Sequence, residues 1–70
     1  MKLHTISVKK SVLREILDNG RDFIITEQND VQIADLINIE NTTLLFKVKD
    51  IIHDDGLKDN YCIIVIKELK

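Results

Sequence analysis

Five stretches of the chain have the pattern of β-strands: most alternate hydrophobic and polar residues with a period of two, and the last is apolar on both faces, as expected of a strand buried between layers. The stretches cover residues 2–8, 23–26, 31–39, 44–49 and 61–66. In the first of them, His4, Ile6 and Val8 share one face. Ala34 and Asp35 interrupt the third stretch, which indicates a bulge or a corner at that point.

One segment has the spacing of a helix instead. Its apolar residues recur three and four positions apart on one face: Val12, Leu13, Ile16 and Leu17. Ser11 precedes this stripe as the predicted N-cap, and Gly20 follows it, where a glycine commonly ends a helix. We therefore predict a helix over residues 11–18, about two turns long, which must pack on a sheet to be stable.

Polar turn residues separate the predicted strands at 28–30, 40–42 and 54–56. The alternation of the strands and the helical stripe together predict the hydrophobic core. The predicted core residues are Leu13, Leu17, Phe23, Ile25, Phe46, Val48, Ile63 and Val65.

A strand, a helix and then four strands joined by short turns predict a curved, largely antiparallel five-stranded sheet. We classify the fold as α+β, mainly β: a small, partly open barrel with one covering helix. A length of 70 residues predicts a single domain over 1–70. Such a short chain buries only about 60% of the surface of its unfolded form, so we also expect a homodimer that covers a strand edge.

Charge is distributed unevenly along the chain. Residues 1–21 carry a net charge of +3 and residues 22–70 carry −5, which gives −2 overall. The acidic balance argues against broad coating of nucleic acid, although the N-terminal third can still offer a local basic face. The single Cys62 excludes an internal disulfide and favours a cytoplasmic location, and no apolar run is long enough to span a membrane.

The basic residues nearest the predicted helix are Lys9 and Lys10 before its start and Arg21 after its end. A helix start offers free amides and the positive end of the helix dipole, so this face favours a phosphate group of RNA or of a nucleotide. The alternative is an ordinary solvated basic surface. The pattern places Phe23 and Phe46 in the core, which leaves little exposed aromatic surface for base stacking.

Three further residues are candidates for ligand binding, catalysis or metal binding: His4, Thr26 and His53. His4 shares a face with apolar residues, where a hydrogen-bonded structural role competes with ligand binding. Thr26 would need an adjacent base to act as a nucleophile, and the pattern supplies none, so a plain strand role competes there. His53 with Asp54, Asp55 and Asp59 lacks the ligand spacing of a calcium site, so we expect neither a metal nor a cofactor.

Seven short motifs follow one another along nearly the whole chain. They are Lys2-Leu3-His4-Thr5-Ile6, Gly20-Arg21, Phe23-Ile24-Ile25-Thr26, Asn29-Asp30, Ile33-Ala34-Asp35, Gly56-Leu57 and Tyr61-Cys62-Ile63-Ile64-Val65-Ile66. In this order the chain resembles the short bacterial and phage branch of the ASCH family. The resemblance implies a PUA-like barrel that binds RNA or a nucleotide-like ligand. Some members are amidohydrolases that use a lysine, a threonine and a glutamate.

The chain departs from the family at a polar cluster, a lysine after the glycine and then a glutamate and an arginine on the next strand. Arg21 stands for the lysine. With the family's phenylalanine on Phe23, the glutamate becomes Ile24 and the arginine Thr26; without that gap they become Ile25 and Glu27. Strand alternation favours the gapped alignment, because Phe23 and Ile25 then share the core face.

The carboxylate is missing in either alignment, so the resemblance does not extend to amide hydrolysis. The family has a Val-Gly-Asp motif where this chain has Ile33-Ala34-Asp35, so its glycine is replaced by Ala34. Alanine is strained there by roughly 1 kcal/mol if its φ is positive. We expect a small non-catalytic module that binds RNA or a nucleotide-like anion through Lys9, Lys10 and Arg21, with His4 and Thr26 as further contacts. The alternative is a protein-interaction or dimerisation module whose ligand pocket has decayed.

Overall fold

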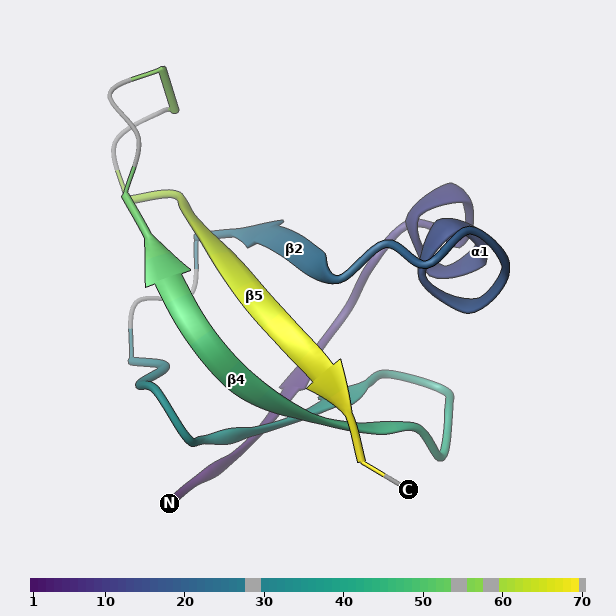
Figure 1. The fold of residues 1–70 in the computed structure, drawn as a ribbon, viewed down its shortest axis with the longest axis horizontal. Helices are drawn as coiled ribbons and strands as arrows, with labels where there is room; N and C mark the ends of the chain where they lie inside the picture. The colour runs from purple at the N-terminus through teal and green to yellow at the C-terminus, as the bar shows by residue number, and fades with distance from the viewer. Residues whose placement is uncertain (28–29, 54–55, 58–59, 70) are drawn as a thin grey trace.

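The computed structural model describes residues 1–27, 30–53, 56–57 and 60–69. The elements follow the predicted order of a strand, a helix and four strands (Figure 1). They are β1 (Leu3–Ile6), α1 (Lys10–Asp18), β2 (Phe23–Thr26), β3 (Leu36–Ile39), β4 (Leu45–Ile52) and β5 (Cys62–Glu68). Most of the predicted turns at 28–30 and 54–56 lies outside the described residues, as do Asn29 of the motifs and Asp54, Asp55 and Asp59.

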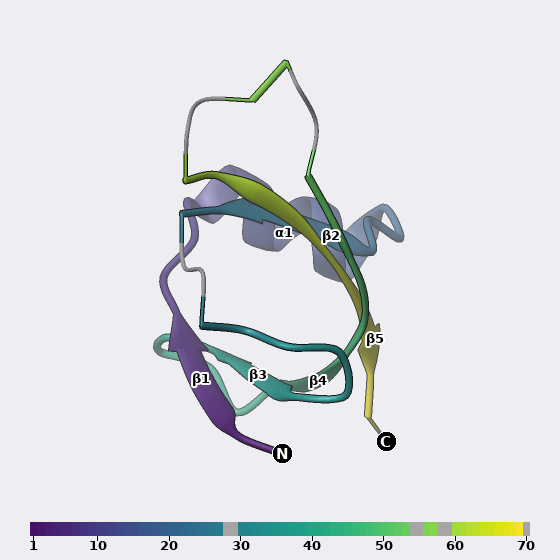
Figure 2. The ribbon, with the colours of Figure 1, turned by 90° about the vertical axis from the view of Figure 1, so that its left-hand side faces the viewer.

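The five strands form one sheet in the order β1-β3-β4-β5-β2. β1 and β3 pair in parallel, and the other pairs are antiparallel, so the prediction of a largely antiparallel sheet is confirmed. Figure 2 shows the sheet curled, with β1 and β3 facing β2 and β5 across the interior. β1 and β2 remain its two edges, so the sheet is not closed into a barrel.

Each of the five strands contributes hydrophobic side chains to the interior of the curl. In the described part of the chain, the buried hydrophobic residues are Ile6, Ile24, Val31, Ile37, Ile39, Phe46, Val48, Cys62, Ile64 and Ile66. Phe46 and Val48 confirm the predicted facing of β4, because their neighbours Lys47 and Lys49 point to solvent. This strand carries a clear alternation of apolar and charged residues, which fixes its inner face.

The predicted facing of β2 is wrong. Ile24 is 2% exposed and lies in the core, whereas Phe23 and Ile25 are 36% and 45% exposed. β5 shows the same reversal, because Ile64 pairs with Ile24 and is buried, while Ile63 is only half-buried. Both strands are apolar on both faces, so alternation alone does not determine which face lies inside. The reversal also removes the reason for the gapped family alignment, since Phe23 and Ile25 do not share the core face.

Helix α1 starts one residue before the predicted position. Its N-cap is Lys9 rather than Ser11, and the extended backbone of Lys9 makes no side-chain cap hydrogen bond. Ser11 lies inside the first turn instead. Gly20 follows the helix with φ 71°, a left-handed conformation that suits glycine, as predicted.

The apolar stripe of α1 is only partly covered. Leu13 and Ile16 pack against the core but are only half-buried, so the prediction that Leu13 is buried is confirmed only in part. Leu17 is 53% exposed, so its predicted core position is wrong. A helix this short cannot place every residue of its stripe against the sheet.

The interruption at Ala34 and Asp35 is a corner where the chain turns into β3. Ala34 has a positive φ of 77°. Its amide donates to the carbonyl of Val48 at 2.9 Å, and the amide of Val48 donates to the carbonyl of Asp35 at 2.8 Å. The corner is therefore held against β4, and Ala34 cannot relax to a negative φ without losing these bonds.

Ala34→Gly should raise the free energy of unfolding by about 1 kcal/mol, because glycine adopts a positive φ without strain. Urea denaturation of the two proteins measures this difference. Gly20→Ala is the matched control: its φ is also positive and no atom lies within 4 Å of the added Cβ, so it should lower stability through backbone strain alone. An unchanged or lowered stability of Ala34→Gly would contradict the conformation of the corner.

Phe46→Ala should lower the free energy of unfolding by about 3–5 kcal/mol, because it empties a buried core position. In a domain this small that loss approaches the total stability. Phe23→Ala removes the same atoms from the outer face of β2 and should cost about 1 kcal/mol or less. Thermal melts followed by circular dichroism compare the two variants, and equal losses would show that the facing of β2 described here is incorrect.

Candidate functional site

The side chain of Asp35 joins the start of β1 to the corner before β3. Its Oδ1 accepts a hydrogen bond from the amide of Lys2 at 3.1 Å, and its Oδ2 accepts one from the amide of Gln32 at 3.0 Å. The Nε2 atom of His4 lies 2.8 Å from the same Oδ2. These bonds favour the carboxylate, first the one with His4 and then those with the two amides, and they lower the pKa of Asp35 from 3.8 to about 2.

His4 is therefore part of the internal framework. It is 5% exposed, and its Nδ1 lies 3.8 Å from a carboxylate oxygen of the exposed Asp30. The sequence pattern left two roles open for His4, a hydrogen-bonded structural role and ligand binding. The structure shows the first of them. In the residues that the structure describes, no group of three or more histidine, cysteine, aspartate or glutamate side chains is placed to hold a metal ion.

Arg21 lies between the end of α1 and the start of β2. Its Nη1 donates to Oε2 of Glu15 at 2.8 Å, and its Nε donates to the carbonyl of Phe23 at 3.0 Å. The guanidinium carbon lies 4.3 Å from the centroid of the Phe23 ring, within the range of a cation–π contact. Arg21 is thus held in a fixed direction by three contacts.

Lys9 and Arg21 line one pocket between the β1–α1 connection and β2. This pocket, called the β2 pocket below, has a volume of about 340 Å³. It is lined by Ser7, Val8, Lys9, Val12, Arg21, Ile24 and Ile25. Its walls are mainly apolar, and its two cations come from opposite ends of the helix.

The structure does not bring every predicted site residue to the β2 pocket. Lys10 lines a separate hollow of about 240 Å³ on the helix, together with Arg14 and Asp18. Thr26 ends β2 opposite Cys62, is half-buried, and does not line the β2 pocket. Burial raises the pKa of the Cys62 thiol, which disfavours the reactive thiolate.

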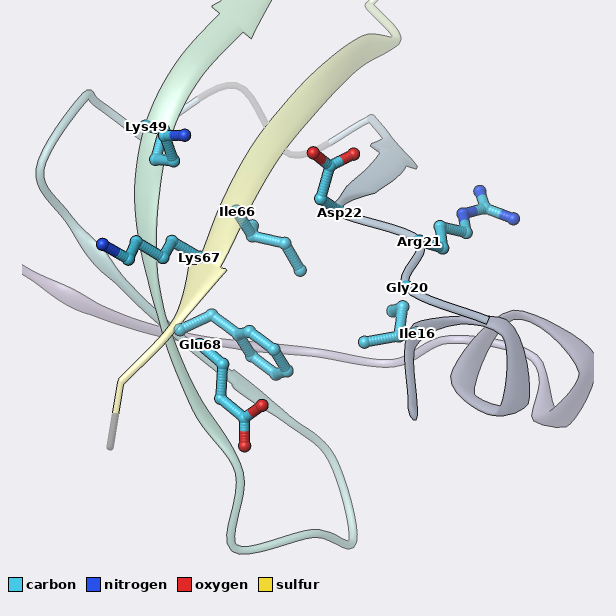
Figure 3. Close-up of a pocket in the computed structure, with 9 residues that line it drawn as sticks. Ile16, Gly20, Arg21, Asp22, Lys49, Ile66, Lys67 and Glu68 are labelled. Carbon is cyan, nitrogen blue, oxygen red and sulfur yellow. The ribbon is translucent and has the colours of Figure 1, made fainter. Parts of the chain in front are cut away.

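A second pocket opens just before the start of β2, beside the end of β5. This β5 pocket has a volume of about 360 Å³ and is lined by Ile16, Gly20, Arg21, Asp22, Phe46, Lys49, Ile66, Lys67 and Glu68. Figure 3 shows that Ile16 and Ile66 point into it, while the guanidinium of Arg21 points away. Sequence reasoning missed Lys49 and Lys67, because only the strand register brings them together. Arg21 lines both pockets and so lies between them.

Comparisons with known proteins add no assignment. No protein-family model and no curated protein matches the chain. None of the described helices is long and apolar enough to cross a membrane.

Asp35→Asn should lower the free energy of unfolding at neutral pH. It should also make the free energy of unfolding depend less steeply on pH in acid. The folded chain lowers the pKa of Asp35 to about 2, so its contribution is complete above about pH 4 and is lost as the pH falls toward 2. Thermal melts between pH 2 and pH 7 measure the difference. The exposed Asp22→Asn variant is the control, and an equal acid response in wild type and Asp35→Asn would contradict this role for Asp35.

Proposed function

We propose that the chain is a non-catalytic binding module of the ASCH type, with a PUA-like fold, that binds RNA or a nucleotide-like anion beside α1. One observation carries the proposal: Lys9 and Arg21, which are distant in the sequence, line the same pocket. This arrangement agrees with the resemblance, in which a charged cluster between the helix and the next strand holds the ligand.

The β2 pocket has the size and the surface that such a ligand needs. Its volume of about 340 Å³ lies within the range of small-molecule sites, and such sites are mostly apolar with a few polar groups. Val8, Val12 and Ile25 offer apolar walls for a base or a sugar. Lys9 and Arg21 offer charge for a phosphate.

The start of α1 adds favourable electrostatics to the same side of the pocket. The N-cap residue Lys9 provides no side-chain cap, and the first turn of the helix contains no acidic residue. The first amides of a helix lack intrahelical partners, and the helix dipole is positive there. A phosphate group near Lys9 would therefore meet an ammonium group and uncapped amides together.

Arg21 can exchange its present partner for a ligand. Its bond to Glu15 is on the surface, since the Glu15 side chain is 50% exposed. Surface ion pairs contribute about 0–1 kcal/mol, so a phosphate with two oxygens facing the guanidinium can compete with Glu15. The bond to the Phe23 carbonyl keeps the guanidinium oriented meanwhile.

The lining of the β2 pocket argues against hydrolysis. Among the described residues it contains no carboxylate, and the two positions that can take the place of the family's glutamate, Ile24 with the gap and Ile25 without it, are both apolar. A general base must lie within hydrogen-bond reach of the reacting group, and no acidic residue lines this pocket to serve as one.

We expect no release of acetate from an acetylated cytidine, because the β2 pocket offers no carboxylate base. Ile24→Glu should not create this activity, since it buries a charge in the core and destabilises the fold. Chromatography of the nucleoside after incubation with each protein measures the reaction. Clear turnover by the wild type would contradict the non-catalytic assignment.

Lys9→Ala combined with Lys10→Ala should weaken the binding of a short single-stranded RNA by about tenfold, because the Lys9 contact of the β2 pocket and a second positive charge at the start of α1 are removed. Filter binding at low and moderate salt measures the affinity and its salt dependence, which should become shallower in the double variant. Lys2→Ala combined with Arg14→Ala removes the same charge away from the β2 pocket and is the control. Equal affinities for wild type and the Lys9 and Lys10 variant would refute the proposal.

A further inference from the structure

A second basic cluster lies on the outer face of β4 and β5. Lys47 stands directly opposite Lys67 across the ladder of these strands. The register shifts between Val48 and Asp50, which leaves Lys49 as the extra residue of a bulge. Bulges redirect side chains, and Lys49 lines the same pocket as Lys67. Three of the five basic residues that follow Arg21 therefore converge here, in the acidic part of the chain.

No ion pair joins these lysines to an acid among the described residues, although the carboxylates of Asp22 and Glu68 line the same pocket as Lys49 and Lys67. All three are exposed, and among the described residues only His4 and Arg21 have a basic side chain within ion-pair distance of a carboxylate. The Oδ1 atom of the nearby Asp50 accepts a hydrogen bond from the amide of Ile51 at 2.8 Å. Like charges directly opposite on neighbouring strands destabilise a sheet, so the pair of Lys47 and Lys67 is unfavourable until an anion binds.

An exposed aromatic ring lies beside this cluster. Phe23 pairs with Val65, and Lys67 is the next residue of β5 on the same outer face. The ring is 36% exposed and carries the guanidinium of Arg21 against it. Figure 3 shows Lys67 leaving β5 on the opposite side from Ile66 and extending across β4, the strand that carries Lys49. Aromatic and guanidinium planes stack on unpaired bases, while lysines contact the phosphates between them.

We propose that the outer face of β2, β5 and β4 binds single-stranded RNA, with Lys47, Lys49 and Lys67 on phosphates and Phe23 stacked on a base. The inference rests on the proposed function: the anionic ligand of the β2 pocket would be one nucleotide of an RNA strand that continues onto this face. Arg21 lines both the β2 pocket and the β5 pocket, so a strand can continue from one to the other. A single nucleotide would reach only one of them.

A second copy of the chain is a less suitable occupant of this face. The face does carry apolar side chains, since Ile25 and Ile52 are 45% and 43% exposed and both pair with Ile63. A two-fold dimer uses the same surface of each subunit, so it would bury both lysine clusters within one interface. Phosphates remove this repulsion, whereas a second copy increases it.

Lys47→Ala combined with Lys67→Ala tests the proposal. Fluorescence anisotropy with a labelled uridine-rich RNA should show affinity reduced by about tenfold or more, while binding of uridine monophosphate is unchanged. Phe23→Leu should weaken the binding of the same RNA by about tenfold, because the stacking of a base on the ring is lost. Without RNA, the double lysine variant should melt at or above the wild-type temperature, because a like-charge pair is gone.

The outcomes separate this inference from the proposed function. RNA affinity that falls in the Lys9 and Lys10 variant but not in the Lys47 and Lys67 variant would overturn the sheet-face site and leave the β2 pocket supported. Absence of binding of both RNA and uridine monophosphate by the wild type would overturn both. A dimer in light scattering that Ile63→Lys disrupts would show that a second copy covers this face, and would also overturn the inference.

Discussion

The fold depends on the buried carboxylate of Asp35. It accepts hydrogen bonds from the amides of Lys2 and Gln32 and bonds to His4, so it connects the edge strand β1 to the corner before β3. β1 pairs only with β3, in parallel, and receives no other strand partner. The positive φ of Ala34 presents Asp35 at this corner, and the backbone bonds to Val48 fix the corner on β4. A strained residue and a charged side chain therefore hold three strands in register.

The order and type of the elements follow from local patterns, which is why the sequence predicts them well. The helix shows a period of three to four, β4 alternates apolar and charged residues, and Gly20 marks a helix end. The inner face of β2 is different, because Phe23, Ile24 and Ile25 are all apolar and either face satisfies the pattern. Only the pairing of Ile24 with Ile64 in the folded sheet decides between them.

The residues of the candidate site also differ in how far the sequence predicts them. Lys9 and Arg21 flank the helix, so their approach at one pocket follows from local structure. The approach of Lys47, Lys49 and Lys67 depends on a strand register and a bulge, and neither has a signal in a single sequence. The reversed facing of β2 matters here too, because it turns Phe23 from a core residue into a surface ring. The aromatic surface that the pattern failed to predict is thus present beside the lysines.

Together these features describe a small sheet whose interior is held by Asp35 and whose two basic surfaces meet at Arg21. We propose that one RNA strand contacts both surfaces. Amide chemical-shift mapping by NMR during titration with a short single-stranded RNA tests it most directly. An RNA strand bound across both surfaces should shift the amides of Lys9–Val12, Phe23, Lys47–Lys49 and Lys67, with little change at His4 and Asp35. Shifts confined to other surfaces, or none at saturating RNA, would contradict it.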